Sequence, residues 1–512
     1  MPVLPFADWK PDLSPYKAAS SQIIQNVFPR ADGYGPVASV SQYSQALPCR
    51  GYFYARNADQ SVTVFAATAT KLYKLNNTTF AWTDVSKGGG SYTGVGNGEQ
   101  WQFAQFNNFV IAVQINTVPQ VFDLTSSSAF ADLGGSPPQA RYVAVANRFV
   151  VLSGMGTATP YRIQWSGLNA VTTWTSGVNS SDFQDLPDGG VVRAIGGGET
   201  GLITQDAALR RMVFAPGAPY VFQIDRVAQD KGIFAPLSLV RGGDRLFFAG
   251  NDGFYMILPG GYPIPIGKER FDRTFFADAD ASQLHLIIGA SDPRATRVYW
   301  TYKSLAGSAG LFDKILVYDY SIERAALIMQ SGEYLATLAR PGLTLEGLDS
   351  ISSSIDALTF SLDDVATSAL SQLSIVDSSH VLGFFGGPIA GGPALEATLD
   401  TAEQTLDRRM RVKGFRPMTD APTCYGSIGA RENLQSTVTY SAEQAVNGRG
   451  CAPPTSRRAS PAGGCASRPA PRGRSRAASS PWWRKKACGS KGRSRRDALM
   501  LRSRAKARRL EA

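Results

Sequence analysis

Residues able to carry out catalysis or bind a metal are few in this chain, and their spacing does not assemble a site. His285 and His380 are the only histidines, which nearly excludes chemistry that needs an imidazole base or several histidine ligands. The five cysteines form no CxxC pair and no metal-ligand spacing, and we expect them to be isolated reduced thiols: Cys49, Cys424, Cys451, Cys465 and Cys488. We therefore predict no catalytic, cofactor-binding or metal-binding residues and no enzymatic activity.

Two glycine clusters and two acidic pairs are the remaining motifs that could bind a ligand or act on one. Neither Gly94–Gly98 nor Gly196–Gly198 precedes a predicted helix whose N-terminus could meet a phosphate, so both predict turns. Asp278 and Asp280 form a D-x-D pattern without a third ligand at loop spacing, which favours a solvated turn over a calcium site. The adjacent Asp363–Asp364 would point to opposite faces of a strand, so they cannot flank one glycosidic bond.

The elements that would position any site are predicted to be strands. The chain is 43% hydrophobic and 18% charged, and it is rich in Gly, Thr, Ser, Tyr and Phe, which is the balance of an all-β protein. From about Val62, apolar strand runs recur, each followed by a polar turn and a second run that ends in an aromatic residue. The runs are Val62–Leu75, Phe109–Leu124, Arg148–Trp165, Gly201–Phe214, Asp244–Leu258 and Arg297–Tyr320.

The spacing of these runs predicts a β-propeller of about six blades over residues 61–338. Their starts lie 39 to 53 residues apart, and a four-stranded blade needs roughly 40–50 residues. A stacked array of β-sandwiches would show similar hairpins and is the competing architecture. The repeats typical of sialidase-like and WD40 propellers are absent. Aromatic residues inside the strand runs are predicted to be core rather than a platform for glycan stacking: Phe247, Phe248, Tyr299 and Trp300.

Two further β-rich or extended segments flank the predicted propeller. Residues 1–60 are interrupted by Pro, Gly, Asn and Ser, which predicts an extended arm. Its apolar residues Phe6, Trp9 and Phe28 suit anchors of a strap between subunits. Residues 339–447 contain stretches of alternating polarity that predict a second β-rich domain.

The net charge of +11 is divided unevenly along the chain. Residues 448–512 hold 19 Lys/Arg and 2 Asp/Glu, which gives +17 and leaves 33 and 39, or −6, for residues 1–447. Because the last segment contains no Val, Ile, Tyr or Phe, it predicts a disordered, basic low-complexity tail. The abrupt change of composition favours translation in a shifted reading frame; a genuine basic tail that contacts DNA or a capsid partner is the alternative.

Neither a membrane span nor a secretory signal is predicted. No apolar run reaches the roughly 18 residues that a span requires. The first residues, MPVLPFADWKPDL, lack the basic start and apolar core of a signal peptide. We therefore expect the chain to stay in the cytoplasm of the cell that makes it, which suits a protein assembled there into a particle.

Several stretches, in order along residues 5–447, resemble the packaged-DNA stabilisation or tail-nozzle proteins of short-tailed bacteriophages. Each motif is weak alone, and the ordered set is more specific. The stretches are Gln25–Val37, Gly201–Phe214, Gly232–Ile257, Pro263–Phe276, Thr344–Asp349, Leu395–Glu403 and Val412–Asp420. The resemblance implies a structural virion protein that forms a ring at the distal end of the tail channel and keeps packaged DNA in the head until ejection. It implies no active-site residues and no cofactor. Similar proteins end in further strands, where this chain has its basic tail.

The implied partners are other copies of the chain, neighbouring tail or connector proteins, and the double-stranded DNA that passes through the channel. By analogy with the family the ring would be a hexamer, located in the virion tail after assembly in the host cytoplasm. A mildly acidic body suits such a channel, since carboxylates weakly repel DNA phosphates. The alternative is a receptor- or glycan-binding propeller at the tail tip, which predicts an exposed aromatic and polar cluster on one propeller face.

Overall fold

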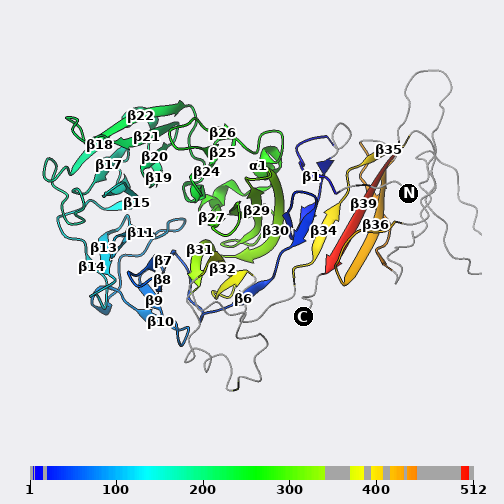
Figure 1. The fold of residues 1–512 in the computed structure, drawn as a ribbon, viewed down its shortest axis with the longest axis horizontal. Helices are drawn as coiled ribbons and strands as arrows, with labels where there is room; N and C mark the ends of the chain where they lie inside the picture. Colours follow the sequence, from blue (N-terminus) through cyan, green and yellow to red (C-terminus); the bar gives the residue numbers. More distant parts are fainter. Residues whose placement is uncertain are drawn as a thin grey trace, which may run out of the picture.

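Seven blades of four antiparallel strands surround a common axis in the structure, a computed structural model (Figure 1). Six blades are separate four-stranded sheets, and blade six is part of a larger sheet. The structure describes residues 4, 6–14, 20–340, 354, 370–385, 394–406, 415–431, 435–446 and 497–506, the last of these by its backbone alone. From the axis outward, blades one to three consist of β7 (Tyr52–Arg56), β8 (Val62–Ala67), β9 (Leu72–Leu75) and β10 (Trp82–Asp84); β11 (Gln102–Phe106), β12 (Phe109–Gln114), β13 (Thr117–Asp123) and β14 (Ala131–Asp132); and β15 (Ala140–Ala146), β16 (Phe149–Met155), β17 (Arg162–Trp165) and β18 (Asp182–Asp185).

The remaining four blades follow the same order along the chain, except for the last strand of the seventh. Blades four to six consist of β19 (Val192–Gly196), β20 (Thr200–Gln205), β21 (Ala208–Phe214) and β22 (Phe222–Gln229); β23 (Val240–Gly242), β24 (Arg245–Gly250), β25 (Gly253–Ile257) and β26 (Ile264–Pro265); and β27 (Gly289–Asp292), β28 (Arg297–Tyr302), β29 (Phe312–Asp319) and β30 (Arg324–Gly332). Blade seven consists of β31 (Tyr334–Arg340), β32 (Leu370–Val376), β33 (Leu382–Phe385) and β6 (Val40–Gln42).

The ring is closed by strands from the two ends of the propeller sequence. The first strands contact one another around the axis, β7 with β11, β11 with β15, β15 with β19, β23 with β27, β27 with β31, and β31 with β7. The outer strand of blade seven is β6, which precedes blade one in the chain and pairs with β33. Strands from the two ends of the ring therefore share one sheet, which holds the ring closed.

The hairpins follow from the sequence pattern. Asn107 and Asn147 start two-residue turns between the first and second strands of blades two and three, with φ of 52° and 54°. Asparagine tolerates this left-handed conformation, which such tight turns require. The second strands, such as Phe149–Met155, are buried along their whole length between neighbouring blades. The core prediction for four aromatic residues is confirmed, because each is at most 1% exposed: Phe247, Phe248, Tyr299 and Trp300.

The predicted all-β propeller is confirmed, but its extent differs from the sequence prediction. The ring has seven blades rather than about six. It begins at Tyr52, inside the segment 1–60 assigned to the arm, and its seventh blade reaches Phe385, inside the segment 339–447 assigned to a second domain. The boundary at 338/339 falls within β31. The N-terminal arm comprises the described residues up to Gln42: β1 (Asp8–Trp9), β2 (Ser20–Ser21), β3 (Ile24–Gln25), β4 (Val27–Pro29), β5 (Tyr34–Pro36) and β6.

A second group of strands, the C-terminal sheet, extends the sheet of blade six beyond β3. It contains β34 (Ala397–Asp400), β35 (Gln404–Leu406), β36 (Thr423–Arg431), β37 (Thr439–Tyr440), β38 (Gln444–Ala445) and β39 (Asp497–Lys506). Strand β39 lies between β34 and β36, so the prediction of a disordered tail over residues 448–512 is wrong for these ten residues. They include the apolar run Ala498–Leu501, which a strand can use. The other tail residues lie outside the described part of the chain.

Helical structure is limited to short connections in the described residues. The one α-helix there is α1 (Asp272–Asp278), between blades five and six, and the 3-10 turns are η1 (Lys87–Gly89), η2 (Pro187–Gly189), η3 (Pro236–Ser238) and η4 (Ala281–Leu286). None of the helices in this part of the chain is long and apolar enough to cross a membrane.

Candidate assembly site at the N-terminal arm

The N-terminal arm caps helix α1 from a distant part of the sequence. The carboxylate of Asp12 accepts hydrogen bonds from the backbone N–H groups of Arg273 (2.8 Å) and Thr274 (2.9 Å), and from the Thr274 hydroxyl (2.7 Å). The residue before the helix, Phe271, provides no side-chain cap of its own. Because the first N–H groups of a helix lack partners and favour negative charge, Asp12 both satisfies α1 and fixes the arm to it.

Aromatic residues of the arm pack into the core of blade six. Trp9 is 4% exposed, and its ring stacks on Phe271 at a centroid distance of 6.1 Å. Phe28 meets Tyr299 edge-on at 6.4 Å, and Phe6 packs against the same core cluster as Trp9. The sequence correctly selected Phe6, Trp9 and Phe28 as anchors. In the single chain they anchor the arm to its own propeller; the prediction that the arm is a strap between subunits stays a prediction.

Arg324 of β30 is the main cation beneath the arm. Its guanidinium forms an ion pair with Asp8 (2.7 Å), donates to the Tyr34 hydroxyl (3.0 Å) and to the carbonyl of Arg30, and lies over the Tyr34 ring. The Tyr34 hydroxyl in turn donates to the carbonyl of Ala7 (2.8 Å). Burial raises the pKa of Tyr34 to about 12, although the charge of Arg324 acts to lower it. The phenol therefore stays protonated and keeps donating to the arm at physiological pH.

Strand β3 connects the propeller to the C-terminal sheet. Gln25 pairs in parallel with Leu327 of β30, while Ile24 pairs with Leu399 of β34. Asn26 extends this connection in both directions. Its side-chain oxygen accepts from the Met329 N–H (2.7 Å), and its amide nitrogen donates to the carbonyl of Glu396 (2.8 Å). In the sheet order β3 accordingly lies between β30 and β34, and Figure 1 shows dark-blue N-terminal strands in this place.

Beside this junction, α1 begins with a buried carboxyl group. Asp272 is 7% exposed, and its Oδ1 accepts from the Phe254 N–H (3.1 Å). The carboxyl group fits closely against Gly253 and Gly267, where any Cβ would collide with it. Burial raises the pKa of Asp272 to about 6, and the neighbouring carboxylate of Asp12 acts in the same direction. Compared with the unfolded chain, the folded protein therefore favours the protonated form of this group.

We predict that replacing Asp272 with asparagine flattens the dependence of stability on pH. Between the usual pKa of 3.8 and the raised value of about 6, the folded state binds more protons than the unfolded state. The contribution of Asp272 to the free energy of unfolding should therefore fall as pH rises through this window, by up to about 3 kcal/mol, and level off above it. Denaturation at a series of pH values measures the difference between wild type and variant.

The matched control is Asp280→Asn, because hydrogen bonds from Lys303 and Ser282 lower the pKa of Asp280 to about 2. Its replacement removes a stabilisation that is present above about pH 4 and fades as pH falls toward 2, so it should lower stability by a nearly constant amount between pH 4 and 6 and leave the slope there intact. An Asp272→Asn variant with the slope of the wild type would show that Asp272 does not titrate in this range.

The D-x-D pair does not form a shared cation site. Asp278 pairs with Lys314 (2.6 Å), in an open groove of about 440 Å³ between the arm and α1. Asp280 pairs with Lys303 (2.9 Å) and accepts from the Ser282 N–H at the start of η4. Across the described ranges, no group of three or more His, Cys, Asp or Glu side chains could hold a metal ion.

The two glycine clusters lie in connections between strands, as predicted. Residues 94–98 belong to the loop between blades one and two, while Gly196 ends β19 and only residues 197–198 lead on toward β20. Gly98 lies against the ring of His285, and the Gln100 amide donates to the His285 carbonyl (3.4 Å). Gly98 and Gln100 precede the inner strand of blade two, whereas His285 precedes the inner strand of blade six. Because these blades are not neighbours in the ring, the contact brings the two loops together across the axial opening. Burial lowers the pKa of His285 below its usual value.

Cysteines and the second histidine also occupy structural positions. Cys49 and Cys424 are buried free thiols, and burial raises the pKa of each above its usual value, which disfavours the reactive thiolate. His380 pairs with Glu333 (2.8 Å) where blade seven meets blade one. The other candidates lie outside the described residues: Cys451, Cys465, Cys488 and Asp363–Asp364.

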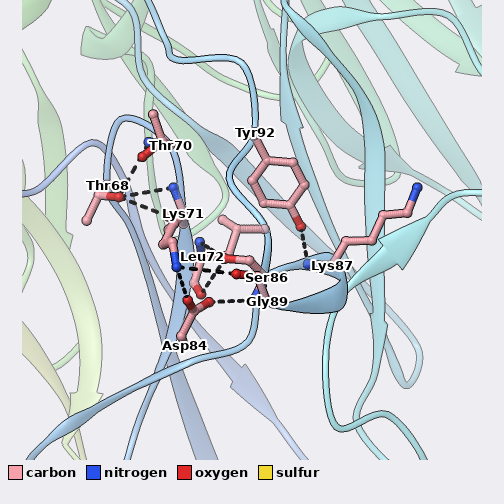
Figure 2. Close-up of polar contacts among 9 residues, drawn as sticks. All are labelled: Thr68, Thr70, Lys71, Leu72, Asp84, Ser86, Lys87, Gly89 and Tyr92. Atoms are coloured by element: carbon pink, nitrogen blue, oxygen red, sulfur yellow. Dashed lines mark hydrogen bonds and ion pairs between the residues drawn. The ribbon is translucent and has the colours of Figure 1, made fainter.

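Figure 2 shows a polar network that sequence motifs did not reveal, at the junction of blades one and two. Lys71, in the turn after β8, pairs with Asp84 of β10 (2.5 Å). The backbone N–H of Lys87 donates to the Tyr92 hydroxyl (2.8 Å), which contacts Gln120 of β13 (3.2 Å). Lys71 and Asp84 pair with each other, and the Lys87 ammonium pairs with Asp132 of β14, which the figure does not draw. The arrangement of this network fixes the loop between two blades.

The strand order and its closure define a seven-bladed β-propeller joined to a C-terminal sheet. Neither the comparison with protein-family models nor the comparison with curated proteins finds a match. Solved structures similar to the chain include the extracellular domain of a hybrid two-component system from B. thetaiotaomicron (10% identity, TM-score 0.40, 74% of this chain and 44% of that chain). They also include the Pan2 WD40 domain of Neurospora crassa (9%, 0.37, 67% and 95%) and the computationally designed Ika8 protein (11%, 0.34, 69% and 99%). The chain thus spans less than half the length of the first of these structures.

Proposed function

We propose that this chain is a structural protein of a short-tailed bacteriophage virion, which forms a ring at the distal end of the tail channel and retains packaged DNA until ejection. The observation that carries the proposal is where the resembling stretches lie. Gln25–Val37, Pro263–Phe276 and Leu395–Glu403 are far apart in the sequence, yet each contributes to one hydrophobic cluster at the arm junction. Their convergence supports the view that they form one structural unit, as a shared family would require.

The arm junction also supports a mechanical role. Strand β3 pairs with both the propeller and the C-terminal sheet, so the chain presents these parts as one connected block. A propeller exposes few long strand edges, and a block of this kind can repeat around a ring when a head-to-tail interface closes by rotation. A block of this kind can bear mechanical load in a ring, and this role needs no catalytic group.

The DNA channel of this proposal lies between copies rather than along the propeller axis. The contact of Gly98 and Gln100 with His285 places two loops across the axial opening. Duplex DNA, whose major groove alone is about 12 Å wide, needs an open passage wider than that. A ring of copies around a wider central opening provides one.

We expect the chain to assemble into a cyclic homo-oligomer, a hexamer by analogy with the family it resembles. Native mass spectrometry and electron microscopy of the purified chain, alone and with its tail partners, measure the copy number and show whether a central opening exists. A closed ring wide enough for duplex DNA is the expected result. A chain that stays monomeric even with its tail partners would contradict the ring.

A further inference from the structure

A short turn of the N-terminal arm lies against the start of α1 and is held there by hydrogen bonds. Residues 10–13 form this turn, and each of them is only partly buried. The Asp12 carboxylate caps α1, and the Asp12 N–H donates to the Arg270 carbonyl (3.1 Å). The open groove between the arm and α1 borders Pro11 and Thr274, so solvent reaches this side of the turn.

The turn can leave α1 while the rest of the arm stays in place. Loss of a helix cap costs much less free energy than removal of a buried tryptophan from a core. Trp9, directly before the turn, is 4% exposed and stacked on Phe271, so it continues to hold the arm. Local opening is therefore confined to residues 10–13.

A second carboxyl group, that of Asp272, lies at the same helix start. It is enclosed between Gly253 and Gly267, where a Cβ on either glycine would collide with its oxygens. Its Oδ1 accepts from the Phe254 N–H (3.1 Å). The space around the group fits a carboxyl closely and leaves little room for the water that an ionised carboxylate needs.

The charges around Asp272 do not compensate its ionised form. Asp12 on the arm and Asp252 before β25 both act to raise its pKa. The basic groups in and around these elements pair with other acids or lie in solvent: Lys231 with Asp252, Arg270 with Glu323 (2.7 Å), Arg273 with Glu269 (3.9 Å), and Lys268 exposed. An ionised Asp272 thus meets a like charge on Asp12, and opening of the turn relieves this repulsion.

We propose that residues 10–13 and Asp272 form a proton-controlled latch on the N-terminal arm: the turn stays on α1 while Asp272 is protonated and opens more often once Asp272 is ionised. Because Asp12 repels the ionised form, the closed state binds the proton more tightly than the open state does. The closed state therefore loses its advantage as pH rises through the raised pKa of about 6. The latch acts within one chain and does not depend on the proposed ring.

Hydrogen exchange of the full chain, followed by mass spectrometry between pH 5 and 8, measures how often the turn opens. The N–H groups of Asp12, Arg273 and Thr274 report on opening, because each donates a hydrogen bond that the closed turn provides. Unstructured peptides of the same sequence correct for the intrinsic acceleration of exchange with pH. Peptides from β16 show whether the whole chain becomes looser instead.

In the wild type we expect opening to increase about 3- to 10-fold between pH 5 and 8, as a like-charge effect of about half to one pKa unit produces. Asp272→Asn keeps an acceptor for the Phe254 N–H but does not ionise, so opening should stay at its low-pH level throughout. Asp280→Asn is the matched control and should keep the wild-type response. A wild type without the increase, or an equal increase in Asp272→Asn, would overturn the latch.

Asp12→Asn tests the coupling between the two carboxyl groups and remains informative if Asp272→Asn does not fold. Asparagine caps helices about as well as aspartate but carries no charge. Its introduction should lower the pKa of Asp272, so the increase in opening should become smaller and begin at lower pH. An Asp12→Asn chain with the same increase at the same pH as the wild type would overturn the proposal.

Discussion

Replacing Trp9 with alanine should lower the free energy of unfolding by about 3–5 kcal/mol and release the N-terminal arm from the propeller. The Trp9 side chain is 4% exposed and stacked on Phe271, so its removal leaves a cavity in the core of blade six. Asp12→Ala should cost less, about 1 kcal/mol, since it removes the cap of α1 but little apolar contact. Chemical denaturation measures both changes.

Limited proteolysis separates release of the arm from a general loss of stability. In Trp9→Ala the arm should be cleaved under conditions in which the propeller blades stay intact. Tyr262→Ala removes an aromatic ring that is 76% exposed, so it serves as the matched control and should change stability by less than about 0.5 kcal/mol. A Trp9→Ala chain with wild-type stability and a protected arm would show that the arm is not held at this site.

Local patterns predicted most of the propeller because each blade is encoded by adjacent residues. Apolar runs with tight turns, such as the turn that Asn147 begins, recur at the spacing of a blade and reveal their burial directly. The apolar residues Trp9 and Phe28, which the sequence suggested as anchors, do pack against the propeller, Trp9 buried and Phe28 partly buried. Such patterns report that a side chain is apolar, but not which surface covers it, so the contact of the arm with the chain's own propeller could not be predicted from the sequence.

The seventh blade was missed because its strands are not adjacent in the sequence. Residues 341–369 separate β31 from β32, which interrupts the regular spacing, and β6 comes from an irregular segment near the N-terminus. The arm junction was hidden for the same reason. Asp12 and Thr274 are 262 residues apart, and no periodicity or composition relates a capping carboxylate to a helix at that distance.

The second large effect that we expect concerns whole particles. Particles assembled without this chain should fill their heads with DNA and then lose most of it, because the distal end of the tail channel stays open. A variant with a displaced arm, such as Trp9→Ala, should show part of the same defect if a connected propeller and C-terminal sheet are needed for the ring. Gene order offers a supporting observation, since a nozzle gene should lie next to the portal and tail-adaptor genes.

The most direct test of the central claim is the amount of nuclease-resistant DNA in particles that lack this chain, followed over time after packaging and compared with complete particles. The account predicts that packaging proceeds normally and that protected DNA then declines as heads empty. Supplying the wild-type chain during assembly should restore retention. Heads that keep their DNA but fail to adsorb to cells would contradict the account and favour a receptor-binding propeller at the tail tip.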